Sequence, residues 1–206
     1  MDNSAEGETK RVLITGFGPF AGAAVNPSWE GVNIMNTNEL ETKYNIQLFK
    51  EKIDVGYNDV DSSVPKLWDK LQPDLTIHVG VSSAASHFLL ETQARKEGYE
   101  TEDSTGTCPV DHKHWSDGPE TICTDLDVGV MCEEFNSDPP ADGLKAEQSS
   151  DAGKFLCEYT YYTSLSCRGT SKTLFVHVPL TEYSYEQIAI GLERVLQICL
   201  KQLRAN

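Results

Sequence analysis

The chain has 206 residues, with 17 Lys and Arg against 32 Asp and Glu, and a formal net charge of −15. This length suits one large domain or two small ones. Between Glu91 and Glu147 there are 15 acidic and only 4 basic residues. Nucleic acids and anionic membranes bind clustered Lys and Arg, so the composition argues against both as partners.

The first ten residues are polar and acidic, and they predict a disordered leader (1–10) that precedes a single domain over 11–206. They lack the basic region and the apolar stretch of a signal peptide. No apolar run approaches the ~18 residues that cross a bilayer. Without an export signal, the cysteines are expected to stay reduced. We therefore expect a cytosolic protein, either a monomer or a weak homo-oligomer.

In the first half of the chain, short apolar runs alternate with segments of helical periodicity. A buried strand over 11–15 runs into the loop GFGPFAG (16–22). A helix then begins at Asn26 and is expected to end within 36–40. The elements expected next are a strand over 46–55, a helix over 59–71 and a strand over 75–79.

In the second half, residues 98–118 have no periodicity and exceed the ~12–15 residues of an ordinary loop. The expected elements after them are a helix over 126–135, a strand over 144–148, a helix over 151–165, a strand over 174–178 and a helix over 185–203. This order predicts one α/β domain, with a sheet covered by helices on both faces.

Two motifs could indicate a nucleotide site and a zinc site, but neither matches the pattern that such a site requires. GFGPFAG lacks the Lys-Ser/Thr of a P-loop and carries Ala21 where a dinucleotide fingerprint needs its third glycine. Cys108, His112, His114 and Cys123 are zinc-competent, but their spacing matches no structural zinc site. We expect both of these histidines to be solvated, and we expect no metal or cofactor.

The groups that could carry chemistry are a thiol, two imidazoles and a carboxylate. Cys157 follows capping residues and Gly153, so a helix start near it would favour the thiolate. His78 and His177 both occur near the carboxyl ends of buried strands, where α/β sheets hold catalytic groups. Glu91 follows an apolar segment, and it either orients a histidine or simply starts the exposed segment that follows. The local pattern leaves both histidines open.

Several blocks of the chain resemble the pyroglutamyl-peptidase I family of cysteine peptidases. They are ITGFGPF with VNPSW (14–20 and 25–29), HVGVS (78–82) followed by Leu90-Glu91, DGPE (117–120), SDAGKFLCEYTYYTSL (150–165) and FVHVPL (175–180). The resemblance extends from Val12 to about Leu203. Glu158 and the pair of tyrosines after it are closer to animal than to bacterial members.

The resemblance implies a three-layer α/β/α sandwich around a twisted mixed sheet, and removal of N-terminal pyroglutamate from peptides. It implies Cys157 as the nucleophile, His177 as general base and acid, and Glu91 as the orienting carboxylate. The substrate pocket that it implies consists of Phe17, Phe20, Asn26, Val81, Phe155 and Leu156, with the backbone of Gly80 and Val81 offering hydrogen bonds to the lactam amide. Glu102 stands where an apolar residue of the family approaches the ring. A pyroglutamyl-binding protein with impaired catalysis is the alternative.

Overall fold

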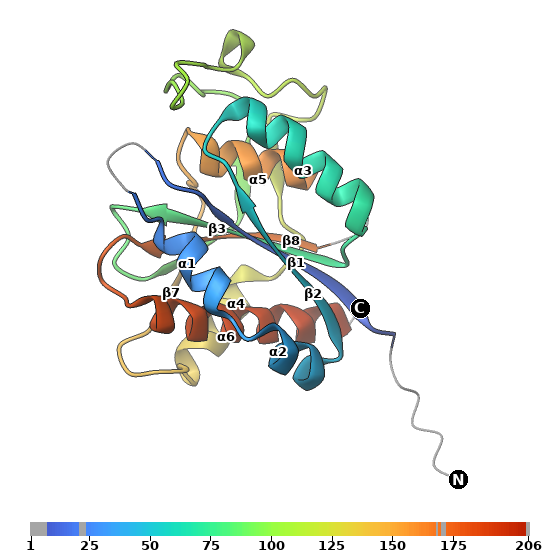
Figure 1. Ribbon diagram of the computed structural model, residues 1–206, viewed down its shortest axis with the longest axis vertical. Coiled ribbons are helices and arrows are strands. Elements are labelled where there is room, and N and C mark those ends of the chain that lie inside the picture. The colour runs from blue at the N-terminus through green and yellow to red at the C-terminus, as the bar shows by residue number, and fades with distance from the viewer. Residues whose placement is uncertain (1–7, 21–23, 168, 170–171, 205–206) are drawn as a thin grey trace.

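The computed structural model describes residues 8–20, 24–167, 169 and 172–204. Most of the predicted leader lies outside these residues, and Lys10 is already the first residue of a strand. A central sheet of six strands has helices on both faces (Figure 1). The prediction of a single α/β/α domain around a mixed sheet is confirmed.

The strands of the central sheet follow the order β2-β1-β3-β8-β4-β7. Their bounds, in that order, are β2 (Ile46–Ile53), β1 (Lys10–Phe17), β3 (Leu75–Ser82), β8 (Lys172–Pro179), β4 (Phe88–Glu91) and β7 (Ala146–Ser149). Two short strands, β5 (Gln93–Arg95) and β6 (Thr121–Cys123), form a separate antiparallel pair.

The position of β8 in this sheet brings distant segments together. β8 is parallel to β3, with His177 opposite Gly80, and antiparallel to β4, with His177 opposite Leu89. β4 in turn runs parallel to the edge strand β7. The last strand of the chain therefore lies between two strands from its first half.

The helices divide between the two faces. They are α1 (Pro27–Ile34), α2 (Thr37–Tyr44), α3 (Tyr57–Leu71), α4 (Val128–Ser137), α5 (Leu156–Cys167) and α6 (Tyr185–Arg204), with a short 3₁₀ turn η1 (Val110–His112). In Figure 1, α3 and α5 lie above the sheet, and α1, α2, α4 and α6 lie below it. Among the described helices, none is both long and apolar enough to cross a membrane.

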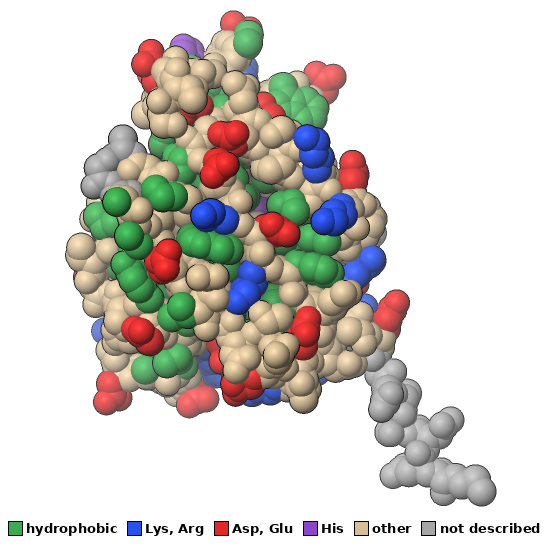
Figure 2. Space-filling model, viewed as in Figure 1, with side chains coloured by type: hydrophobic (Ala, Val, Ile, Leu, Met, Phe, Trp, Pro, Cys, Tyr) green, Lys and Arg blue, Asp and Glu red, His purple; other side chains and the backbone are tan. Residues whose placement is uncertain are grey.

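Each face has its own core. The face covered by α1, α4 and α6 is built mainly from aliphatic side chains such as Val176 and Leu192. The face under α3 and α5 is rich in aromatic rings: Phe17, Tyr57, Tyr99, Tyr159, Tyr161, Tyr162 and Phe175. The acidic side chains are spread among basic and apolar ones on the face in Figure 2, rather than gathered in one patch.

The structure corrects the predicted helix that begins at Asn26. The segment forms two helices, because Met35 leaves the helical conformation and Asn36 starts a new one by accepting a hydrogen bond from the Glu39 amide at 3.3 Å. Buried Leu40 then anchors α2 to the lower core. The residues predicted as a helix end are therefore a helix start.

The aperiodic segment 98–118 is more ordered than its composition indicates. It holds Tyr99 and His114, which are both buried. Within it, η1 is the one helical turn, and a bridge joins Glu97 to Lys113 at its base. The expectation that His114 is solvated is wrong, because this segment packs its ring against the aromatic core.

Candidate active site

Cys157 is the second residue of α5 and follows a turn in which Gly153 has a φ of +79°. Its thiol lies directly against Gly80 of β3: a Cβ added to that glycine would be 2.8 Å from the sulfur. Since Gly80 pairs with His177 across the two strands, the bare backbone at this position lets the thiol approach the imidazole.

His177 is held by Glu91. Its Nδ1 lies 2.8 Å from Glu91 Oε1, and both side chains are buried. The reversed direction of β4 makes this contact possible, because it sets Glu91 opposite Phe175, two residues from the histidine. Glu91 Oε2 has no hydrogen-bond partner among the described residues.

The charge on His177 is favoured by its neighbours. Burial alone would lower its pKa, but the charge of Cys157, the hydrogen bond to Cys157 and the contact with Glu91 together raise the pKa of His177 to about 9. His177 is therefore held as an imidazolium near neutral pH.

His78 occupies a different environment. It is fully buried, its Nδ1 lies 2.7 Å from Thr15 Oγ1, and burial lowers its pKa to about 3. The ring of Phe175 stacks on it with centroids 6.4 Å apart, and the same ring lies 4.9 Å from His177. Of the two histidines left open by the sequence, His177 is the one beside the thiol and the carboxylate.

A small cavity of about 110 Å³ opens beside Cys157. Six of the predicted pocket residues line it: Phe17, Phe20, Asn26, Val81, Phe155 and Leu156. Cys157 lines it as well, and so does Val55, which was not predicted. Gly80, whose backbone was also predicted to contact the substrate, is not among the lining residues. Val55 follows β2, and its place at the end of a predicted strand was the available signal. Glu102 is exposed and is not among these lining residues.

Asn26 shapes the cavity through the loop that it caps. Its Nδ2 donates to the Gly18 carbonyl at 2.9 Å, and its Oδ1 accepts from the Ser28 amide at 3.1 Å and from the Ser28 hydroxyl at 2.7 Å. These bonds fix the backbone directly after Phe17, the last residue of β1. Residues 21–23 of the same loop lie outside the described part of the chain.

A buried ion pair next to the thiol was not predicted. Glu158 is fully buried, and its Oε1 accepts from Arg95 Nε at 2.9 Å and from the Arg95 amide at 3.2 Å. Burial raises the pKa of Glu158 although Arg95 opposes the shift. Arg95 also pairs with Asp151 in the turn before α5, so it ties this turn to β5.

The residues considered for zinc do not converge. Among the described residues, no group of three or more His, Cys, Asp or Glu is placed to hold a metal ion. His114 instead lies 2.9 Å from Ser116 Oγ and 3.0 Å from Thr163 Oγ1, and burial lowers its pKa to about 4. It packs as a neutral ring between these two hydroxyl groups.

Comparison with known proteins gives a consistent set of matches. The family model described as Pyroglutamyl peptidase matches residues 10–201. Pyroglutamyl-peptidase 1 of Rattus norvegicus is 35% identical, over 91% of this chain and 88% of the relative. Pyroglutamyl-peptidase 1 of Homo sapiens is 34% identical, over 96% and 93%. The pyrrolidone-carboxylate peptidase of Bacillus licheniformis is 30% identical, over 91% and 88%.

Solved structures match over almost the whole chain as well. Pyroglutamyl peptidase I of Bacillus amyloliquefaciens superposes with a TM-score of 0.80 at 26% identity, covering 93% of this chain and 97% of that one. The pyrrolidone carboxyl peptidase of Thermococcus litoralis has a TM-score of 0.85 at 22% identity, covering 96% of each chain, and shows the shared fold.

Proposed function

Because the chain belongs to the pyroglutamyl peptidase family and is a cysteine-type peptidase, we propose that it removes N-terminal pyroglutamate from peptides. In this proposal Cys157 is the nucleophile, His177 is the general base and acid, and Glu91 orients the imidazole. The observation that carries this proposal is the buried His177–Glu91 contact at 2.8 Å beside a thiol that opens on an apolar cavity.

In the first half of the reaction, His177 holds the proton that it has taken from the Cys157 thiol, and the sulfur attacks the carbonyl that follows the lactam ring. Backbone N–H groups at the start of α5 have no partner within the helix, and they are suited to hold the oxyanion. As the C–N bond breaks, the imidazolium gives its proton to the departing amine. A thioester of pyroglutamate and Cys157 remains.

In the second half, His177 takes a proton from a water molecule, which attacks the thioester. The sulfur leaves as a thiolate, pyroglutamate is released, and the proton stays on the imidazole. Throughout, Glu91 accepts a hydrogen bond from Nδ1, which keeps Nε2 free for the proton transfers. Each step uses groups of the chain and water alone, so we expect turnover to continue in the presence of EDTA.

The size and the apolar lining of the small cavity support a pyroglutamyl substrate. Its volume of about 110 Å³ is well below the ~300–1,000 Å³ of sites for drug-sized ligands, so it suits one small ring. We propose that Phe17, Phe20 and Phe155 flank that ring, while Asn26 and the backbone at Val81 meet its polar edge. A pyroglutamyl residue has no ammonium group, which makes an apolar receptor favourable.

The experiment is hydrolysis of a pyroglutamyl amide of a fluorophore in the presence of a thiol reductant. Cys157→Ser and Cys157→Ala should abolish release, whereas Cys167→Ser, at the far and exposed end of the same helix, should keep it. Turnover by either Cys157 variant would exclude the mechanism. If the reduced wild type binds pyroglutamate without turnover, the chain is instead a binding protein of this family.

We further propose that this activity belongs to the cytosol and to a monomer or weak homo-oligomer. Among the described residues, Cys108, Cys132, Cys157, Cys167 and Cys199 form no disulfide, which suits a reducing compartment. Light scattering at micromolar concentration tests the second point, and a stable tetramer would contradict it.

A further inference from the structure

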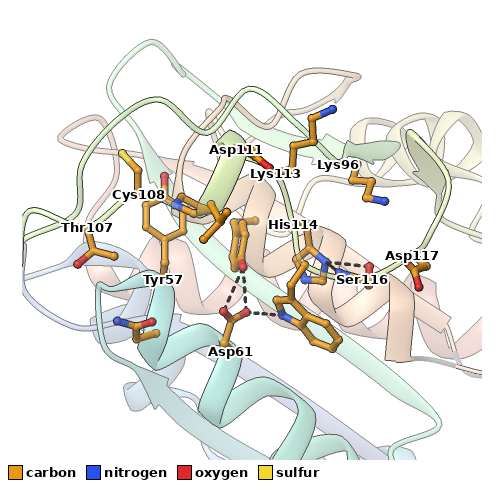
Figure 3. Close-up of a pocket in the computed structure, with 15 residues that line it drawn as sticks. Tyr57, Asp61, Lys96, Thr107, Cys108, Asp111, Lys113, His114, Ser116 and Asp117 are labelled. Carbon is orange, nitrogen blue, oxygen red and sulfur yellow. Dashed lines mark hydrogen bonds between the residues drawn. The ribbon is translucent and has the colours of Figure 1, made fainter.

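A second and larger cavity, of about 480 Å³, lies between the start of α3 and the segment 98–118. Figure 3 shows Tyr57 and Asp61 of α3 on one side of it and His114 of the loop on the other. Trp115, also from the loop, lines it as well. The Trp115 side chain is 63% exposed. None of the steps proposed above uses this cavity.

Asp61 is a negative charge held in a fixed position. Its Oδ1 accepts from Trp115 Nε1 at 2.8 Å, and its two oxygens accept from the Tyr159 hydroxyl at 3.0 and 3.1 Å. Burial raises the pKa of Asp61, while both hydrogen bonds favour its ionised form and act in the opposite direction. Among the described residues, no Lys, Arg or His forms a salt bridge with this carboxylate.

The two lysines of the cavity do not supply the missing cation. Lys113 Nζ lies 2.7 Å from Glu97, and Lys96 Nζ donates to the Gly118 carbonyl at 3.2 Å. In Figure 3 both ammonium groups point away from Asp61. A carboxylate without a salt bridge, beside a largely exposed indole, is a favourable setting for an organic cation, since the ring adds a cation–π attraction.

The two cavities lie near each other, because Tyr57 lines the large one, Phe155 lines the small one, and their ring centroids are 5.8 Å apart. Phe155 lines the small cavity, and Tyr159, one helical turn along α5, lines the large one. In the turn between β2 and α3, Val55 likewise lines the small cavity and Asn58 lines the large one. One helical turn is ~5.4 Å, and an extended peptide advances ~3.3–3.6 Å per residue, so a bound peptide reaches the second cavity within a few residues.

We propose that the second cavity binds a Lys or Arg side chain of the substrate peptide, two to four residues after the pyroglutamyl residue. Asp61 pairs with the cation and Trp115 stacks on it. This inference rests on the proposed function, and it makes the enzyme selective for basic pyroglutamyl peptides.

The test compares kcat/KM for pyroglutamyl peptides that carry Arg, norleucine or Glu at the second, third or fourth position after pyroglutamate. At one of these positions Arg should exceed norleucine by about tenfold, the combined effect expected of a partly exposed ion pair and a cation–π contact. Asp61→Asn keeps the acceptor oxygen for Trp115 and should reduce that ratio below about threefold. Asp59→Asn, an exposed acid of the same helix outside the cavity lining, should leave it unchanged.

The outcomes separate the two proposals. Equal kcat/KM values for the Arg, norleucine and Glu peptides in an active enzyme would overturn the second cavity's role and leave the peptidase proposal standing. If no pyroglutamyl peptide is turned over, the cavity is tested by titrating the Arg peptide against tryptophan fluorescence. A saturable change that Trp115→Phe and Asp61→Asn both remove would support the site, and no change would overturn it. Trp115→Phe also substitutes for Asp61→Asn if that variant fails to fold.

Discussion

Replacing Gly80 by alanine tests the placement of the thiol. The added Cβ would lie 2.8 Å from Cys157 Sγ and 2.8 Å from Phe175 Cζ, whereas carbon contacts are most favourable at ~3.5–4.0 Å. Both contacts are therefore about 0.7 Å too short. Because Phe175 is fully buried and packed against the rings of Phe17 and Tyr161, the new methyl group is pushed toward the partly exposed thiol, which is displaced.

The expected effect follows from that displacement. A misplacement near 1 Å can cost ~100-fold in rate, so we expect kcat on a pyroglutamyl amide to fall by about 10- to 100-fold in Gly80→Ala. The overpacking itself should lower the free energy of unfolding by about 1–3 kcal/mol, which urea titration measures. KM should change little, because Gly80 is not among the lining residues of the small cavity.

The matched control is Gly129→Ala. A Cβ at this helical position would lie 3.4 Å from Asp127 Oδ1, an ordinary contact, so alanine should leave kcat unchanged and hold or raise stability. Wild-type kcat in Gly80→Ala, with the expected behaviour of the control, would refute the reasoning that the thiol is seated against β3.

The remaining predictions concern pH and the buried ion pair. Because the pKa of His177 is raised to about 9, its stabilising contribution is complete below pH ~6.5 and is lost as pH rises through 9. Urea titrations should show this fall in the free energy of unfolding, and the fall should be smaller in Glu91→Gln. An unchanged alkaline slope in that variant would contradict the assignment of the slope to His177. Because burial lowers the pKa of His78 to about 3, stability should also fall as pH drops below ~6.5, and His78→Leu should reduce that slope. Arg95→Ala should cost about 3 kcal/mol by leaving buried Glu158 uncompensated, and adding Glu158→Leu should recover most of it. Strictly additive costs in that double variant would show that the pair is not coupled.

The sequence predicted the central parallel strands of the sheet well because they are buried on both sides and read as continuous apolar runs. β3 and β8 are examples. It did not predict β4, whose four residues are too few for a periodic signal. The contact of Glu91 with His177 spans 86 positions, and no local pattern encodes which strands become neighbours.

The same limit applies to the choice of histidine and to the second cavity. His78 and His177 have similar local sequences, and the difference between them is the register of β3 and β8 and the ring of Phe175 between them. The resemblance to a known family led to the prediction of His177 and of the pocket residues without that geometry. Asp61 and Trp115 carried no signal, because they meet only through the fold of an aperiodic segment.

The central position of β8 has a consequence for how the protein is made. The strand lies between β3 and β4, so neither can complete its pairing until residues 172–179 leave the ribosome. Contacts between segments far apart in the chain also form slowly. The thiol, the imidazole and the carboxylate can therefore meet only after nearly the entire chain is synthesised, and a truncated product lacking β8 would have an unpaired sheet edge at each of these strands instead of an active site.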